Sequence, residues 1–430
     1  MAHIVIGQKL QSPLLRFDFA QPMYIDKDPF QGLRRFGPFD KDFPERKQFI
    51  NAILMYPHSY ESSVREFCKK LESGFRIYPG YKYIFRQSIN IVDEIKVKDN
   101  VNPLAFIETF AKEAENYIEI HSTNLPDIVL VFHPEKKHYI DESPYFSAKA
   151  VFAKANIPTQ SVTIRQLSNN QGLPFVLANI SLAIYSKCGG MPWVLSHDDN
   201  FPDLVIGVGR SDINQYQHFG FTTLFSKNGS FIYWRSDLPK PIDEYQNSLS
   251  KQIVEAIRDY QQRFQTPITK IAFHISGKRT GKREKEAVRK AIEELNLEFK
   301  FAIIHISDNA PYWIFDTNTN SYQPEKGLLI QITRHTYLIT IEGRLEGKVQ
   351  LPRKPIKVEI DKSSTISFDE YEYLLTQIYW LSKMNWRGFR PKNIPVSVYY
   401  PKLMSYLALR LKNWGEIIDK PNLRRKAWFL

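Results

Sequence analysis

The sequence has few cysteines and histidines and no long apolar run. Cys68 and Cys188 are the only cysteines among 430 residues, which excludes a disulfide framework and a cysteine-rich zinc site and favours a reducing, cytoplasmic compartment. The ten histidines lack metal-ligand spacing, and we interpret His133 and His138 of HPEKKH as surface residues. The N-terminus has no apolar signal core, and apolar runs are as short as IVLVF. We therefore expect no signal peptide and no membrane insertion.

Acidic residues are also in short supply relative to basic ones. Lysine and arginine number 58 against 46 aspartates and glutamates, a net charge of +12. A balance of this size favours a polyanionic partner such as nucleic acid, although a basic surface that only aids solubility has the same composition. The length and the 43% hydrophobic content are sufficient for two or three domains with sizeable cores.

Strand and helix patterns alternate from about residue 50 to residue 187. Periodicity predicts strands at 50–57, 126–134 and 160–167 and helices at 61–73, 105–120, 143–156 and 173–187. This order is typical of an α/β fold with a mostly parallel sheet. An irregular arm at 1–40, interrupted by Pro and Asp residues, precedes this alternation. We predict a Rossmann-like domain over 41–192.

The pattern changes near GGMPW at 189–193. Three strands follow in succession, at 203–209, 218–226 and 230–236, and then a long helix that has one apolar face from Tyr245 to Phe264. Further strands at 268–277 and 299–307 alternate with a helix. Three antiparallel strands followed by α/β alternation are the order of an RNase H-like fold, which we predict over 193–430.

A basic stretch, GKRTGKREK at 277–285, is the densest charge run. Its glycines are four apart, so it lacks the spacing of a P-loop. Lys278 and Arg279 are candidates for contacts with nucleic-acid phosphates, but a solvated helix start explains them equally well.

A second group of residues has the chemistry needed to hold a terminal phosphate and stack its base. Tyr145 and Lys149 lie one turn apart on a predicted helix, and Gln160 begins the next strand. Asn179 and Lys187 lie two turns apart on the apolar helix. Taken singly, each is an ordinary surface residue, whereas together they offer ammonium groups, amides and an aromatic ring.

These residues resemble a known arrangement. Tyr145, Lys149, Gln160 and Lys187 are similar to the 5′-phosphate-binding quartet of the MID domain of Argonaute and Piwi proteins. The stretch YWLSKMNWRGFRPKNIPVSVYYPKLM at 379–404 closely resembles the end of their PIWI domain. GLRRFGPFD and SKCGGMPWVL are also similar to short prokaryotic, archaeal-type Argonautes. The resemblance covers about residues 30–430 and implies a MID domain at 41–192 and a PIWI domain at 193–430.

The resemblance implies a role for each member of the group. Tyr145 would stack on the first guide base, and the phosphate would be held by Lys149, Gln160 and Lys187, assisted by Asn179. The C-terminal carboxylate of Leu430 would help to hold a divalent cation, Mg²⁺ or Mn²⁺, at the guide phosphate. Some relatives have a further polar ligand where this chain has Ala183, so the coordination of that cation is an open question.

The resemblance also indicates where a nuclease would carry its metal ligands. The carboxylate positions of cutting relatives fall here on Gly209, Ser276 and Lys402, none of which can replace a metal-binding carboxylate in two-metal chemistry. We therefore expect a protein that is not a nuclease. The alternative is a guide-directed endonuclease with displaced carboxylates. Asp203 lies at the far end of the strand, and we expect Asp212 in a turn beyond it.

The sequence thus predicts a guide-dependent nucleic-acid-binding protein. Its partners would be a guide RNA or DNA with a 5′-phosphate and a complementary target, for which we expect DNA, with Asn385 and Arg387 as further backbone contacts. Without cutting, the readout would lie in a separate effector or N-terminal-domain-like protein, as in a defence system against plasmids or viruses. No motif distinguishes RNA from DNA.

Overall fold

The computed structural model describes residues 7–99, 102–134, 143–168, 171–196, 199–212, 218–277, 281–296, 298–343, 353–411 and 413–430. The chain divides into two compact units, each of which contains segments distant in sequence. We call residues 15–194, 386–389 and 406–430 the four-stranded unit, and residues 1–14, 195–385 and 390–405 the nine-stranded unit, after their main sheets.

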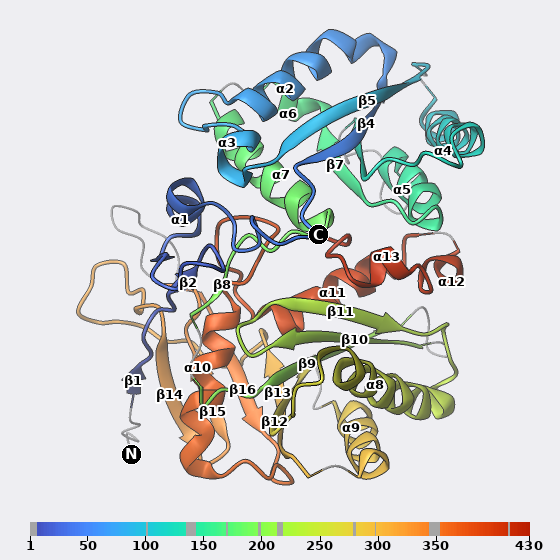
Figure 1. Ribbon diagram of the computed structural model, residues 1–430. Helices are drawn as coiled ribbons and strands as arrows, with labels where there is room; N and C mark the ends of the chain where they lie inside the picture. Colours follow the sequence, from blue (N-terminus) through green and yellow to red (C-terminus); the bar gives the residue numbers. More distant parts are fainter. Residues whose placement is uncertain are drawn as a thin grey trace. The chain divides into compact units, whose positions relative to one another are not determined.

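The four-stranded unit is built on a fully parallel sheet in the order β5, β4, β6, β7. Helices α4 and α5 pack together on one side of this sheet, and α2, α3 and α7 lie on the other (Figure 1). The elements are β2 (Leu15–Arg16), β3 (Ile25–Asp26), α1 (Pro29–Phe36), β4 (Phe49–Pro57), η1 (His58–Tyr60), α2 (Glu61–Ser73), α3 (Tyr81–Phe85), β5 (Ser88–Val97), α4 (Pro103–Ile120), β6 (Ile128–His133), α5 (Pro144–Lys154), β7 (Thr159–Thr163), α6 (Ile164–Ser168), α7 (Leu173–Lys187), β8 (Val194–Leu195), α12 (Trp414–Ile417) and α13 (Pro421–Arg424).

Local sequence explains why these elements form. Every residue of β6 is buried, as expected for a central parallel strand with both faces covered. Helix α5 begins at a Ser-Pro pair, where the Ser143 hydroxyl accepts a hydrogen bond from Phe146 N at 3.2 Å and Pro144 takes the first helical position. The expected α/β alternation is therefore present. Strand β5 was not predicted, because exposed Ile91 and Val92 give this edge strand no clean alternation.

The nine-stranded unit has a mixed sheet in the order β1, β14, β15, β16, β13, β12, β9, β10, β11. Strands β9, β12 and β13 are parallel, whereas β9, β10 and β11 form the antiparallel succession that the sequence predicts. The elements are β1 (Gly7–Lys9), β9 (Leu204–Asp212), β10 (His218–Ser226), β11 (Phe231–Ser236), α8 (Ile242–Phe264), β12 (Lys270–Ser276), α9 (Lys282–Leu295), β13 (Lys300–Ser307), β14 (Leu328–Thr333), β15 (Thr336–Ile339), β16 (Ile356–Ile360), η3 (Phe368–Glu370), α10 (Tyr371–Leu381) and α11 (Val396–Ala408).

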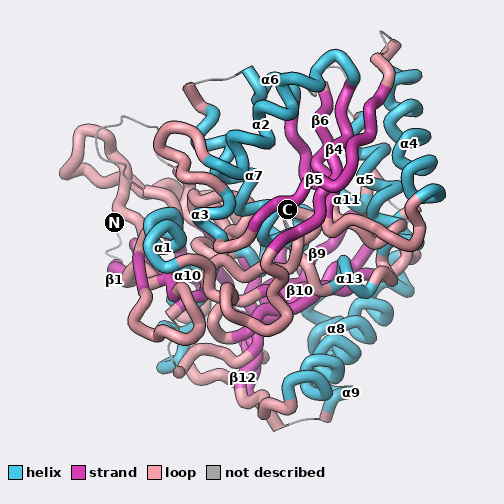
Figure 2. The backbone as a smooth tube through the Cα atoms, turned by 45° about the horizontal axis from the view of Figure 1, so that its top comes forward, coloured by secondary structure: helices cyan, strands magenta, loops and turns pink. Residues whose placement is uncertain are grey.

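Helices α8 and α9 lie side by side (Figure 2) and bury their apolar faces in the core of this unit. The buried face of α8 contains Tyr245, Leu249, Ile253, Ile257 and Tyr260, as its spacing predicts. Phe264, expected on the same face, is 42% exposed at the end of the helix, because the helix there has passed the edge of the core. Among the described residues, none of the helices is both long and apolar enough to cross a membrane.

Two stretches pack differently from the expected domain division. Residues 406–430 and 386–389, expected in the second domain, belong to the four-stranded unit. Residues 15–40 of the expected irregular arm also belong to it, whereas residues 1–14 belong to the nine-stranded unit. The division between Val194 and Leu195 lies close to the boundary that the sequence suggests.

Candidate nucleic-acid interface

Two lysine side chains meet at the first residue of β7. Lys149, from α5, donates to Thr159 Oγ1 at 3.4 Å and to the main-chain oxygen of Trp428 at 3.2 Å. Lys187, the last residue of α7, donates to the main-chain oxygen of Thr159 at 2.8 Å. The fold thus brings together two lysines that are 38 residues apart in the sequence, as the resemblance implies.

Both ammonium groups are buried. Lys149 and Lys187 are each 1% exposed, and within the described part of the chain no ion pair joins either to a carboxylate. Burial, together with the nearby charge of Arg387, lowers the pKa of Lys149 to about 7. The pKa of Lys187 also lies well below its ordinary value, because of burial and the charges of Lys149 and Arg387. Such a site favours an anionic ligand that restores the charge balance.

An aromatic pair lies beside the lysines. The ring of Tyr145 stacks on His133, with 5.4 Å between centroids and 21° between planes. His133, at the end of β6, is 7% exposed, and its Nε2 lies 2.7 Å from Ser161 Oγ. The interpretation of His133 as a surface residue is therefore wrong, because the buried strand β6 continues through it. His138 lies outside the described residues.

Two amides complete the predicted group. Gln160 is 8% exposed and donates from Nε2 to the Ser161 carbonyl at 2.8 Å, while its buried Oε1 has no partner within the described structure. The oxygen of this amide is thus available to a hydrogen-bond donor. Asn179 is exposed, and its Oδ1 accepts a hydrogen bond from Phe389 N at 3.2 Å. It therefore holds the segment that contains Arg387 against α7.

The C-terminus enters the same unit. Trp428 supplies the carbonyl that accepts from Lys149 and also places its ring 4.7 Å from Lys149 Nζ. Leu430 is 8% exposed, and Ala183 is buried and offers no ligand atom. Among the described residues, no group of three or more His, Cys, Asp or Glu could hold a metal ion.

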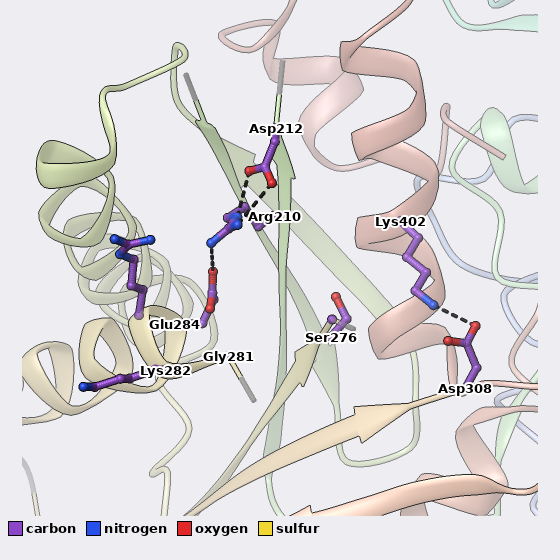
Figure 3. Close-up of a pocket in the computed structure, with 10 residues that line it drawn as sticks. Arg210, Asp212, Ser276, Gly281, Lys282, Glu284, Asp308 and Lys402 are labelled. Carbon is purple, nitrogen blue, oxygen red and sulfur yellow. Dashed lines mark hydrogen bonds and ion pairs between the residues drawn. The ribbon is translucent and has the colours of Figure 1, made fainter. Parts of the chain in front are cut away.

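A second site lies in the nine-stranded unit, where the expected metal-ligand positions fall. Ser276 and Lys402 line one cavity of about 840 Å³ (Figure 3). A Cβ atom built on Gly209 would lie 3.6 Å from Ser276 Oγ, so this position adjoins the cavity. The structure therefore brings Gly209, Ser276 and Lys402 together.

The carboxylates that line this cavity are already engaged with cations. Figure 3 shows Arg210 between Asp212 and Glu284, and Lys402 extending from α11 to Asp308. The Arg210 ion pairs measure 2.8 Å to Asp212 and 3.5 Å to Glu284, and the Lys402 ion pair with Asp308 measures 2.9 Å. Burial raises the pKa of Asp212, but hydrogen bonds with Arg210 and His218 outweigh this effect, and the net shift is downward.

Asp212 is the last residue of β9 and not part of a turn, contrary to the sequence-based expectation, because pairing with β10 continues to His218. Asp203, just before β9, accepts from Thr269 N at 2.8 Å and pairs with Lys227 at 2.9 Å. Both aspartates have structural partners.

The remaining predicted contacts have different outcomes. Lys278 and Arg279 lie outside the described residues. Asn385 is 3% exposed, and its amide donates to the Arg390 carbonyl at 3.1 Å, so it acts inside the fold. Arg387 is exposed and acts electrostatically on both buried lysines. Sequence reasoning placed it on a nucleic-acid backbone. It assigned His133 to the surface and did not single out Thr159, since neither belongs to a recognisable motif.

Comparisons with known proteins identify the family of the chain. The sequence profile of the Piwi domain matches residues 128–413. The chain is 27% identical to a Piwi protein of Archaeoglobus fulgidus over 93% of both chains. It is 24% identical to a protein argonaute of Cereibacter sphaeroides over 93% of this chain and 56% of that one.

Solved structures show the same fold. Clostridium butyricum Argonaute bound to a guide DNA and a 19-mer target DNA has a TM-score of 0.77 at 21% identity, covering 99% of this chain and 55% of that one. Drosophila Piwi has a TM-score of 0.72 at 16% identity, with 99% and 56% covered. The chain thus spans nearly the full length of the Archaeoglobus relative and about half the length of the others.

Proposed function

Because the chain belongs to the Argonaute/Piwi family, we propose that it holds a 5′-phosphorylated guide strand and pairs it with a complementary target without cutting that target. The observation that carries this proposal is the pair of buried ammonium groups of Lys149 and Lys187, which lack a carboxylate partner among the described residues. A guide phosphate supplies the missing negative charge and accepts charge-assisted hydrogen bonds from both.

The neighbouring residues take complementary roles. Gln160 donates to the phosphate from Nε2 once that group leaves the Ser161 carbonyl, because its free Oε1 is only an acceptor. Tyr145, supported from one side by His133, stacks on the first base. Arg387 adds a third positive charge. A divalent cation, when bound between the Leu430 carboxylate and the guide phosphates, neutralises negative charge that the lysines do not reach.

The proposal of a non-cutting protein rests on the cavity of Figure 3. Two-metal hydrolysis needs several free carboxylates around two closely spaced ions. Here Gly209 and Ser276 offer no carboxylate, and Lys402 places an ammonium group where it repels a metal ion. The cavity instead presents cations to a nucleic-acid backbone, and base pairing with the guide supplies the sequence specificity.

The alternative is an endonuclease that uses displaced carboxylates. Asp212, Glu284 and Asp308 line the same cavity, which is the observation in its favour. Their ion pairs with Arg210 and Lys402 argue against it, since each pair would have to break before a metal could bind.

Incubation of guide-loaded protein with a labelled complementary target and Mg²⁺ or Mn²⁺ distinguishes the two proposals. We expect target retention on native gels and no product on denaturing gels. A single cut at a fixed distance from the guide 5′ end would establish the alternative. A non-complementary target, which should not be retained, is the control.

We also propose that the protein is the sensing subunit of a defence system and that a separate effector or N-terminal-domain-like protein supplies the output. The absence of cutting would require such a readout. Co-expression with the product of the neighbouring gene tests this. Elution of the two proteins together from a sizing column, at every salt concentration at which both stay folded, supports the proposal. Separate elution at low salt contradicts it.

A further inference from the structure

An exposed aromatic group lies on the segment between β13 and β14 in the nine-stranded unit. Residues 308–327 contain no helix or strand, and a connection of this length without regular structure is uncommon unless it has a function. Three of its aromatic side chains are more than half exposed: Trp313 at 52%, Phe315 at 57% and Tyr322 at 55%. Large exposed rings in one segment indicate a binding surface rather than scattered surface residues.

Two of these rings are arranged as a platform. Trp313 and Phe315 are near-parallel, with 17° between their planes and 6.3 Å between their centroids. Residues two apart in an extended segment place their side chains on the same side, so one strand of nucleic acid can reach both rings. We call Trp313 and Phe315 the aromatic platform.

A cation lies beside the platform and can contact a phosphate. Lys354 Nζ lies 5.3 Å from the centroid of the Trp313 ring, and Lys354 is itself exposed. Of the acidic residues that line the cavity beside Phe315, Glu325 is paired with Lys9, and Asp316 accepts a hydrogen bond from Asn318 N at 2.9 Å. Phe315 also lines a cavity of about 290 Å³ together with Lys9 and Pro324, which leaves space beside its ring for the edge of a base.

We propose that the aromatic platform binds unpaired bases of single-stranded nucleic acid, with Lys354 contacting the adjoining phosphate. Stacking on exposed rings beside a cation is the general means by which proteins bind single strands without sequence preference. The single strand would come from the unpaired part of a guide or target, so this inference rests on the proposed function for its biological source. It does not depend on the 5′-phosphate site.

The test measures binding of a fluorescent single-stranded oligonucleotide with a 5′-hydroxyl, which the lysine site does not select. We expect Trp313→Ala/Phe315→Ala to weaken binding at least about fivefold, and Trp313→Tyr/Phe315→Tyr to restore it. Phe264→Ala, which removes an exposed ring (42%) elsewhere in the unit, should leave the affinity unchanged. Lys354→Ala should lower the salt dependence of binding.

Two results would overturn the inference. One is unchanged affinity in the double alanine variant, as expected if the rings contact a protein partner instead. The other comes from photo-crosslinking of a bromouracil oligonucleotide to the unaltered protein, if adducts form only outside residues 312–322. A failure of the proposed 5′-phosphate site would give a different result. The protein would then bind phosphorylated and hydroxyl guides with equal affinity, while Trp313→Ala/Phe315→Ala would still weaken binding of the single strand.

Discussion

Pro401 of α11 lies 2.6 Å from the point that a Cβ atom on Gly209 of β9 would occupy. Two residues earlier on the same face of the strand, a Cβ on Gly207 would lie 1.9 Å from the carbonyl oxygen of Ser397, one turn earlier in the helix. The two glycines therefore allow the helix to pack directly on the strand. The space that a catalytic aspartate would need at Gly209 contains protein.

This packing predicts that an acidic residue cannot simply be returned to Gly209. Gly209→Asp should lower the free energy of unfolding by about 1–3 kcal/mol, because α11 must move to accept the side chain. Ser276→Asp, at a partly exposed position facing the cavity, is the matched control and should change stability little. Denaturant unfolding measures both. Equal stability of the two variants would show that the helix yields easily.

The pH dependence of guide binding follows from the buried lysines. With a pKa of about 7, Lys149 is mostly neutral at pH 8 in the empty site, and the pKa of Lys187 is also shifted downward. A bound phosphate favours their charged forms and raises these pKa values, so binding takes up protons above pH 7. Affinity for a 5′-phosphorylated guide should therefore fall between pH 7 and 9.

Below pH 7 the ionisation of the guide phosphate determines how guide affinity depends on pH. The second proton of its phosphate is lost near pH 6, so affinity should rise from pH 5 to 7. Burial lowers the pKa of His133 to about 4, and this residue stays neutral throughout. Anisotropy at constant ionic strength measures the profile. Lys149→Arg, which stays charged, should reduce the fall above pH 7, and a profile that rises to pH 9 would contradict the account.

His133 should act as a positioning residue for Tyr145. His133→Ala removes the ring against which Tyr145 stacks, so guide affinity should fall about two- to tenfold. His133→Phe keeps a ring and should restore most of the affinity. A guide that lacks its first base should bind both variants equally. If His133→Ala weakens the baseless guide as much as the intact one, the residue supports only the fold.

Chelation tests the proposed cation. EDTA should weaken binding of a 5′-phosphorylated guide and leave a 5′-hydroxyl guide unaffected, because the ion needs guide phosphates as well as Leu430 for its ligands. Added Mg²⁺ or Mn²⁺ should restore the binding that EDTA weakens. EDTA should have no effect on a variant with two residues added after Leu430. An EDTA-insensitive affinity would indicate that Lys149, Lys187 and Arg387 suffice for the phosphate.

The parts predictable from sequence were those with local patterns. Helix α5 and strand β6 followed from a Ser-Pro start and an apolar run, and Lys149 and Lys187 from their spacing in a family motif. Arg387 and His133 could not be placed this way, because their roles depend on chain segments that fold back from elsewhere. The importance of Gly209 was visible in the sequence, but its reason was not, since nothing in the strand reveals that Pro401 packs against it.

The central claim is that the buried lysines select a 5′-phosphate, and one competition experiment tests it. Guides of identical sequence, with a 5′-phosphate or a 5′-hydroxyl, are compared on the unaltered protein and on Lys149→Met/Lys187→Met, with Lys154→Met on the same helix as control. We predict that the unaltered protein and the control prefer the phosphorylated guide at least about tenfold and that the double variant, still folded, has no preference. Equal affinity of the unaltered protein for both guides would contradict the account.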